Sequence, residues 1–467
     1  MSVYIPERPE DIFLKIQRHL SVPRPEWALN SIRELRSQLL QKDYKDFSPI
    51  IVTGHQPIFY HPGILAKDLL SHSLAGAMNA AALNMIVDTD DEDISLQIPV
   101  RGKNGLLAKE TLPLSTRGIA LVGQKISDEK KNKILLRLRE YRKELYQVFI
   151  PTLVPHIREN IDILQEIVLR AETVCEPGIR LREMWEKVHA IRLKTVYTSR
   201  IIQSDAFLVF KEYIFKRENE FRKIYNESLY EYRRNHKIKN KAQPLPGLDD
   251  ASGELPFWNV KNGKRMPFVR GLDISDKNIY PRAVTLTLFC RIFMSDLMIH
   301  GIGGARYDQI TNRLLEKFFK YEAAPFSVAS ATLSLDVRSD YAIDSRSPLD
   351  IKKDLRAYEF DPTCFLPEDD SLAVKKKELV LSRNLPGADL HKIHSEIQSI
   401  NEAARNSIQG IYKDLQNENK RAKIVVKNNL IRLDRTFPFI FYNIAPLIES
   451  IKRYGTTSDE RKMLTRS

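Results

Sequence analysis

Short apolar runs and longer amphipathic segments alternate along the first hundred residues of the chain. Two apolar runs, 50–53 and 84–87, flank a segment of helix length. Apolar runs of this length, separated in this way, are typical of a strand, a helix and a second strand. We therefore predict a β-α-β unit here, with a further strand at 119–122 and helices over residues 8–41.

A second α/β region is predicted later in the chain. Asn262-Gly263 lies between apolar arms and predicts a β-hairpin, because type I′ turns need a positive φ at both central residues. Beyond it we expect a helix over 281–293, a strand at 298–300 and a strand-like stretch over 326–337. The fold class that this pattern predicts is α/β, with a Rossmann-like, mostly parallel sheet and helical insertions.

Two further segments, 134–148 and 390–415, carry apolar residues in alternating steps of three and four. This spacing is typical of a helix that packs along another helix. We predict that these seams form an α-helical coiled coil, and two arrangements stay open. Either the seams pair with each other as an antiparallel hairpin, or the coiled coil joins two copies of the chain in a homodimer.

The length of 467 residues exceeds that of one ordinary hydrophobic core and predicts two or three domains. We divide the chain into five parts, of which the second and fourth build the α/β core. These parts are N-terminal helices (1–44), the first part of the core (45–125), a helical insertion (126–245), the second part of the core (246–340) and a C-terminal helical and coiled-coil region (341–467).

Composition narrows the class of protein. An apolar content of 43% is that of a globular chain, and no apolar run approaches the roughly 18 residues of a membrane span. The first residues lack the basic and apolar segments of a secretory signal. The three cysteines lie far apart and form no C-x-x-C pair, which disfavours a disulfide framework and a zinc ribbon. We expect a cytoplasmic protein without a membrane partner.

The net charge of +13 has three interpretations: nucleic acid as a partner, an anionic small substrate, or a solvated basic surface. The densest basic patches, 233–241 and 420–423, lack the interleaved aromatic residues and glycines of single-strand binding surfaces. We therefore expect a small-molecule substrate rather than a nucleic-acid partner.

The loop after the first strand holds the densest set of candidate site residues. Gly54, His55 and Gln56 follow the strand, and His61 lies further along the same loop. Imidazoles beside helix N-terminal amides bind anionic groups and donate protons. We predict His55 as a catalytic acid or base or as an anion anchor, and Lys67 as the holder of a carboxylate or phosphate. The simpler alternative is a loop whose histidines only satisfy backbone carbonyls.

The acidic run 88–93 after the second strand has three interpretations. A calcium loop is excluded, because Asp93 stands where that loop needs glycine and Pro99 where it needs glutamate. A site for Mg²⁺, an amine or hydroxyl groups is the functional interpretation, with Asp90 and Asp93 as binding residues and Asp91 as a catalytic residue. A solvated turn with one acid capping a helix is the structural one.

A glycine-rich turn follows the strand at 298–300. Gly303 and Gly304 permit the backbone to approach an anion closely, and Asp308 is available as a helix N-cap. With His300 and Tyr307 these residues form the second group of candidate binding residues. If the strands are parallel, both loops leave one edge of the sheet and share a crevice.

Several familiar motifs are absent from the sequence. It has no G-x-G-x-x-G, no G-x-x-x-x-G-K-[ST], no H-x-G-H and no G-x-S-x-G. A standard dinucleotide loop, a P-loop and a serine nucleophile elbow are thereby excluded on sequence grounds. Cys290 lies on an apolar helical face, so we predict a core thiol and not a nucleophile.

These motifs, taken in order, resemble those of the cysteine-adding enzymes of bacillithiol synthesis. That family has T-G-Q-Q after a strand, then a glycine and a [YH]-K pair on the next helix, an E-D-H-D-type cluster and a later G-G-P-G-E turn. The matching positions here are Thr53-Gly54-His55-Gln56, Gly63, Ala66-Lys67, Asp90-Asp91-Glu92-Asp93 and Gly303-Gly304-Ala305-Arg306-Tyr307. His55 replaces a glutamine, Glu92 replaces a histidine, and the last turn lacks its Pro-Gly-Glu.

The resemblance implies a Rossmann-like core, a dimer formed by a coiled coil, and ligase-like chemistry that joins an amine to a carboxylate in a divergent branch of the family. The cofactor stays open, with an adenine nucleotide and Mg²⁺ as candidates and no metal-ligating residues assigned. Two alternatives remain: a non-catalytic binding or scaffold protein that uses its coiled coil, and a nucleotidyltransferase-like protein that binds a nucleotide.

Overall fold

Five parallel strands form the central sheet of the protein. In the computed structural model, which describes residues 1–41, 49–103, 105–240, 243, 245–270, 278–341 and 346–455, they lie side by side in the order β11-β10-β2-β3-β6. The strands are β2 (Ile50–His55), β3 (Ala81–Ile86), β6 (Lys194–Tyr197), β10 (Leu297–His300) and β11 (Phe326–Val328). Numbered along the chain, these five strands follow the spatial order 3-2-1-4-5 of a Rossmann sheet. The predicted α/β class is confirmed.

Helices cover both faces of this sheet, and each face has its own hydrophobic core. Successive residues of a strand point to opposite faces. In β10, Leu297 and Ile299 join one core, whereas Met298 joins the other. The first core includes residues of α1 (Pro9–Leu20), α3 (Pro62–Met78) and α16 (Ala445–Gly455), and the second includes residues of α2 (Leu29–Leu40), α8 (Asp205–Phe215), α9 (Glu218–Asn235), α10 (Ala283–Phe289) and α11 (Ile302–Leu314).

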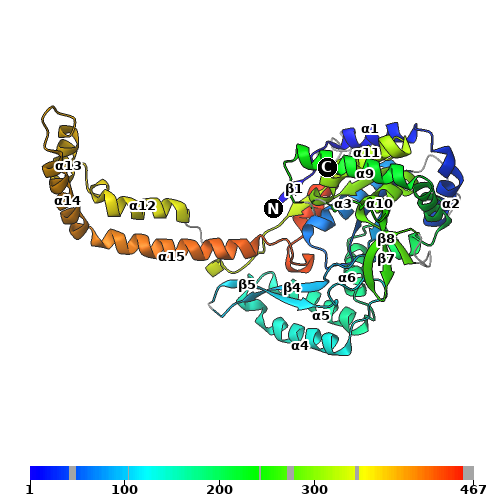
Figure 1. Cartoon of the computed structure of the whole chain (residues 1–467). Coiled ribbons are helices and arrows are strands. Elements are labelled where there is room, and N and C mark those ends of the chain that lie inside the picture. Colours follow the sequence, from blue (N-terminus) through cyan, green and yellow to red (C-terminus); the bar gives the residue numbers. More distant parts are fainter. Residues whose placement is uncertain are drawn as a thin grey trace, which may run out of the picture.

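Smaller sheets and helices are inserted between the core strands (Figure 1). The hairpin of β7 (Glu254–Lys261) and β8 (Lys264–Val269) turns at Asn262 and Gly263, whose φ angles of 52° and 74° confirm the predicted turn. The other inserted elements are β4 (Ser95–Arg101) paired with β5 (Leu107–Pro113), β9 (Ile279–Pro281) paired with β7, and helices α4 (Asp128–Glu144), α5 (Val154–Arg170) and α6 (Glu176–Val188). Outside the core strands along the chain, β1 (Ser2–Tyr4) pairs with β12 (Ser330–Thr332).

Two predictions about strands are wrong. Residues 119–122 form bends and a turn and not a strand; Ala120 and Leu121 are apolar because they are buried, and Leu121 belongs to the first hydrophobic core. The segment 126–245, expected to be helical, contributes the edge strand β6 to the main sheet. This short strand pairs with one neighbour and lacks the apolar run by which the inner strands were found.

The C-terminal helices project from the body as a long arm (Figure 1). The arm consists of α12 (Pro348–Phe360), α13 (Ser371–Ser382), α14 (Leu390–Ser407) and α15 (Gln409–Arg432). In it α12 packs on α15 and α13 packs on α14, and Ile351, Leu415 and Ala422 make a small core. Among the described helices, none combines the length and the apolar character that crossing a bilayer requires.

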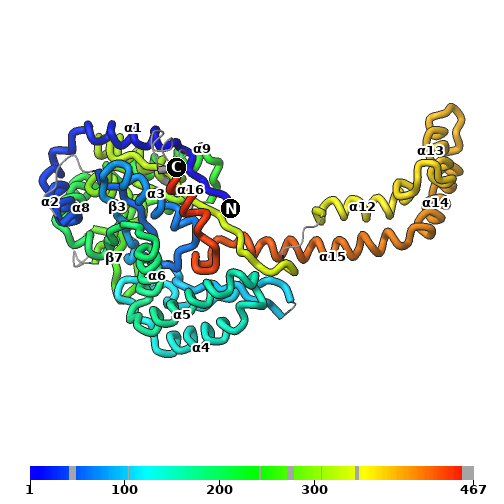
Figure 2. Tube along the Cα trace, turned by 180° about the vertical axis from the view of Figure 1, so that it is seen from behind, coloured from blue at the N-terminus to red at the C-terminus, as the bar shows by residue number. Residues whose placement is uncertain are grey.

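The predicted antiparallel pairing of the two apolar seams is wrong. Residues Ile134, Leu138 and Tyr141 of α4 are buried in the body, where α4 packs on α5. The seam 390–415 lies on the arm, far from α4 in both views (Figures 1 and 2), and its helix is interrupted at Ile408. Heptad-like spacing indicated that each helix packs on another, but it did not specify the partner. A coiled coil between two chains stays a prediction.

A buried carboxylate joins the starts of the two central strands. Asp296 accepts hydrogen bonds from Arg24, Arg36 and the backbone N–H of Ile50, and its own N–H donates to the Ile50 carbonyl over 2.7 Å. Burial raises the pKa of Asp296, but the two guanidinium groups outweigh this effect and hold the pKa below its ordinary value. The N-terminal helices are thereby fixed to the β2–β10 pair.

We predict that Asp296→Asn lowers the free energy of unfolding by about 3–5 kcal/mol, because it removes the buried carboxylate that both arginines pair with. Denaturant unfolding measures this loss. The matched control is Asp162→Asn, which breaks the half-exposed pair with Arg142 and should change the stability by less than about 1 kcal/mol. Equal effects of the two substitutions would contradict the role of Asp296.

Candidate active site

A cavity of about 930 Å³ opens at the carboxyl ends of the central strands. The chain winds from β2 to β3 and β6 in one direction, and from β10 to β11 in the other. The loops that follow β2 and β10 therefore diverge, and ligands of open α/β sheets bind in the crevice that this reversal creates. The cavity is at the upper end of the size range of small-molecule sites.

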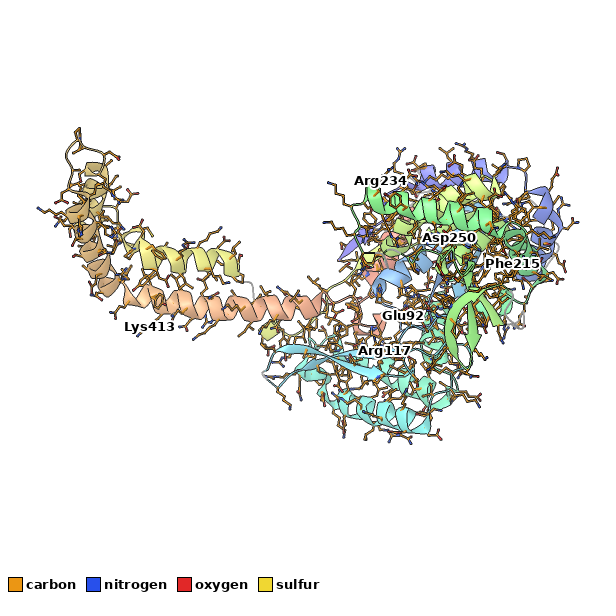
Figure 3. The ribbon with its side chains drawn as sticks, viewed as in Figure 1. Glu92, Arg117, Phe215, Arg234, Asp250 and Lys413 are labelled. Atoms are coloured by element: carbon orange, nitrogen blue, oxygen red, sulfur yellow. The ribbon has the colours of Figure 1, made fainter. Side chains whose placement is uncertain are left out.

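Most of the predicted site residues line this cavity, and the loops after β2, β3 and β10 meet there. Those lining it are Gly54, His55, Gln56, His61, Lys67, Asp90, Asp93, His300, Gly303, Gly304 and Asp308. Asp91 is not among the lining residues, and the side chain of Tyr307 lies outside the described residues. Glu92, which also lines the cavity, lies near the middle of the body (Figure 3).

The start of α3 forms one end of the cavity. The Nδ1 atom of His61, the N-cap residue, accepts a hydrogen bond of 3.0 Å from the backbone N–H of Gly63. The ammonium of Lys67, one turn further, donates to the Gly54 carbonyl over 2.6 Å. Arg435 reaches the same place from far along the chain; its Nη2 donates to Ser330 Oγ. A Cβ at residue 63 would lie only 2.9 Å from the backbone oxygen of Ala331, so glycine is favoured there.

Burial and positive neighbours keep the imidazoles at this end neutral. Burial, Arg435 and Lys67 lower the pKa of His61 to about 3, and burial, Lys67 and His61 hold the pKa of His55 well below its ordinary value. Burial also lowers the pKa of Lys67 to about 8. The role of His55 as an acid or base or as an anion anchor stays a prediction, whereas Lys67 carries most of its charge at neutral pH.

The acids after β3 are partly neutralised. Arg265 forms ion pairs with Asp90, over 2.7 Å, and with Asp91, and the Gln56 amide donates to Asp90 over 2.9 Å. Asp91 is thus a structural ion-pair partner and not the free carboxylate that a catalytic role requires. Glu92 remains at the cavity, and partial burial together with Asp90, Asp93 and Asp91 raises its pKa.

The first acid of the run has a structural role. Asp88 is buried and accepts hydrogen bonds from the backbone and hydroxyl of Ser199, in the first turn of α7 (Thr198–Ile201). This is the helix-capping interpretation of one acid of the cluster. In the described part of the chain, no three His, Cys, Asp or Glu side chains come together in an arrangement that could hold a metal ion.

A histidine–carboxylate pair lies at the end of β10. His300 Nε2 is 2.8 Å from Asp308 Oδ2, and Arg291 lies 3.8 Å from the same carboxylate. Burial raises the pKa of Asp308, but His300 and Arg291 outweigh this effect and lower it. Among the described residues, neither His300 Nε2 nor Asp308 Oδ2 has a hydrogen-bond partner, so the 2.8 Å contact is one of ion-pair distance without hydrogen-bond geometry. Gly304 leaves room beside Nδ1, since a Cβ there would be only 3.0 Å away.

The predicted N-cap role of Asp308 is wrong. The helix α11 begins at Ile302 with Gly301 as its N-cap residue, so Gly303 and Gly304 belong to its first turn. Asp308 follows in the second turn and is 1% exposed, with His300 and Arg291 as its neighbours. The glycine run suggested a longer loop because glycine is a poor helix former, and the tertiary contacts of α11 override that preference.

Sequence reasoning missed several lining residues, among them one tryptophan and three arginines. Trp258 lies in β7, Arg265 lies in β8, and Arg282 directly follows β9. The Arg282 guanidinium lies 4.0 Å from the centre of the Trp258 ring. Arg435 follows the arm helix α15. Arg265 comes just after the predicted Asn262-Gly263 turn, so the sequence placed it near the end of a hairpin. The position of Arg435 along the sequence gave no comparable signal.

The reactivity of the three thiol groups tests the assignment of Cys290 as a core residue. Cys290 and Cys175 are buried, burial raises the pKa of each to about 12, and Cys364 is exposed. We predict that Ellman's reagent modifies one thiol of the native chain rapidly and all three in denaturant. A second fast-reacting thiol at Cys290 would contradict its assignment as a core residue.

No family model and no curated protein matches the chain. Among solved structures, a crystal structure of Plasmodium falciparum tryptophanyl-tRNA synthetase is similar, with 10% sequence identity and a TM-score of 0.25 over 92% of this chain and 98% of that one. A TM-score of this size carries no argument about the site or the function of this chain.

Proposed function

We propose that the chain is an enzyme of the ligase or transferase type that joins an amine to a carboxylate of small polar metabolites. One observation carries the proposal: a single cavity at the switch point of the sheet has a cationic end, an acidic edge and a histidine–carboxylate pair. The cationic end, at Lys67, suits a carboxylate or phosphate. The acidic edge, at Glu92 and Asp93, suits an amine.

The resemblance to the cysteine-adding enzymes of bacillithiol synthesis supports the same proposal. Two of the segments that carry it, 53–56 and 90–93, lie at and beyond the carboxyl ends of neighbouring strands, and the Gln56 amide donates to Asp90 between them. The substrate pair is an amino compound and a small organic acid. A homodimer through the arm belongs to this proposal as well, because the family implies it.

Formation of a carbon–nitrogen bond requires an amine without its proton. In this proposal His300 Nδ1 accepts that proton, and Asp308 stabilises the imidazolium that results. Lys67, whose pKa is about 8, holds the partner's negative charge below that pH. The amine nitrogen then attacks the carboxyl carbon and displaces an activated oxygen substituent.

The cationic end of the cavity, and not a sequence motif, supports an adenine nucleotide as the cofactor. The chain lacks the glycine-rich phosphate loops, but Lys67, Arg435 and His61 converge at the start of α3. When bound, a nucleoside triphosphate supplies the phosphoryl or adenylyl group that makes a carboxylate reactive. The protein residues bind and orient the reactants and accept the proton.

A second candidate function is binding of a partner protein by the arm, without catalysis. The arm favours it because several large apolar side chains there are exposed, among them Phe360 (69%), Leu381 (65%) and Leu430 (69%). In this case deletion of residues 390–420 abolishes the cellular function, while substitution of His300 leaves it intact. The enzyme proposal expects loss of function from the His300 substitution.

Ligand screening tests the enzyme proposal first. We expect the melting temperature of the purified chain to rise with amino sugars or amino acids, with small hydroxy acids, or with ATP, because ligands that bind only the folded state stabilise it. Mixtures of the stabilising amine and acid with ATP are then assayed for an amide product by mass spectrometry. Absence of any stabilising ligand contradicts the proposal.

We predict that His300→Ala and Asp308→Asn each lower kcat by roughly 10²–10⁴-fold, because one removes the base and the other the carboxylate beside it. The control is His394→Ala, which changes an exposed histidine of α14 on the arm. Its kcat should stay within twofold of the unsubstituted enzyme. Unchanged kcat in His300→Ala would exclude this residue as the base.

A further inference from the structure

Lys67 places a charge in the interior without a counter-charge. The side chain is 4% exposed, and none of the ion pairs of the described residues includes it. Its sequence neighbour Asp68 exerts an attraction, but that carboxylate accepts a hydrogen bond of 2.7 Å from Asn84 and lies in the field of Arg182. Buried charges in proteins are normally paired. Lys67 lines the cavity, which has room for an anionic ligand that would serve as its partner.

Two further groups add positive potential at the same place. Arg435, an exposed residue at the cavity, also belongs to no ion pair of the described residues; the neighbouring Asp434 pairs with Lys109 over 2.7 Å. The N-terminal end of α3 carries about half an elementary charge through the helix dipole. Its first amides are occupied within the helix, by His61 Nδ1 and the His61 carbonyl, so this contribution is electrostatic only.

The hydrogen bond from the Gly63 N–H to His61 Nδ1 leaves Nε2 as the donor atom of the ring. Because Nδ1 accepts from Gly63 and the pKa is about 3, the neutral ring carries its proton on Nε2. A neutral donor binds an anion without adding to the charge repulsion between Lys67 and Arg435. The cationic end thus offers an ammonium, a guanidinium and an imidazole N–H to one ligand.

We propose that this end of the cavity is a subsite for a dianionic phosphate group, bound by Lys67, Arg435 and His61. The inference deepens the proposed function and rests on it for the identity of the cavity as the reaction site. Two cationic side chains and a helix N-terminus match a charge of −2 better than the single charge of one carboxylate. The phosphate belongs to a nucleotide or to a phosphorylated metabolite.

Binding of simple anions to the full-length chain tests the subsite. The dissociation constants of inorganic phosphate and sulfate are measured by isothermal titration calorimetry, with acetate as the monocarboxylate. We expect both dianions to bind more tightly than acetate. A nucleoside monophosphate and a sugar phosphate then distinguish the two sources, since the true one binds more tightly than inorganic phosphate.

Four variants assign the binding to the proposed residues. Lys67→Met and Arg435→Gln should each weaken phosphate binding at least tenfold, since hydrogen bonds between charged groups are among the strongest. Lys413→Met on the arm and Arg234→Gln on α9 are the matched controls, because both residues are exposed (Figure 3). Phosphate affinity in the controls should stay within twofold of the unsubstituted chain.

The pH dependence of sulfate affinity, measured on the unsubstituted chain, gives a test that does not depend on how the variants fold. Sulfate keeps its charge of −2 across the range, whereas Lys67 loses its proton above a pKa of about 8. Sulfate affinity should therefore be constant below about pH 7 and fall above pH 8. In Lys67→Met, which removes the titrating ammonium, this fall should disappear.

Each outcome decides between the subsite and its alternatives. No binding of phosphate, tighter binding of acetate than of phosphate, or equal binding to Lys67→Met overturns the phosphate subsite. Phosphate binding that depends on Lys67 and Arg435, in a chain that forms no amide product, supports the subsite and contradicts the proposed reaction. Amide formation without phosphate binding supports the proposed reaction and contradicts the subsite.

Discussion

The buried carboxylate of Asp296 fixes the geometry on which the site depends. It holds Arg24 and Arg36 in the interior and bonds to the backbone of Ile50, so that β2 and β10 start in register. Because the strands are parallel and adjacent, their far ends also lie side by side, and these ends carry His55 and His300. An ion cluster at one edge of the sheet thereby sets the spacing of functional side chains at the other.

Charge is distributed unevenly within the cavity, and this unevenness is its main chemical property. Arg265 neutralises Asp90 and Asp91 on one side, whereas Lys67 and Arg435 have no carboxylate in their ion-pair range among the described residues. Burial lowers the pKa of Lys67 only to about 8, so the ammonium persists at neutral pH. An anionic ligand supplies the missing charge, and this is the physical reason to place the acidic or phosphorylated substrate there.

Local sequence patterns predicted the elements whose signals are local. The apolar runs 50–53 and 84–87, the Asn262-Gly263 turn and the strand before Gly301 were recognised because strand and turn preferences act over a few residues. The edge strand β6, the partner of α4 and the position of Arg435 depend on contacts between distant segments, which a single sequence does not encode in its periodicity. The same limit applies to the acidic run 88–93. The sequence showed that these acids cluster, but it did not show that Asp90 and Asp91 pair with Arg265.

Hydrogen–deuterium exchange of the full-length chain, with and without inorganic phosphate, tests whether the switch-point cavity is the ligand site. Ligand binding there should slow exchange in the segments that surround the cavity, namely 54–67, 298–308 and 433–437. Exchange in the arm helices α13 and α14 should not change. Protection confined to the arm would contradict the assignment of the cavity as the ligand site, and no protection in either region would contradict the phosphate subsite.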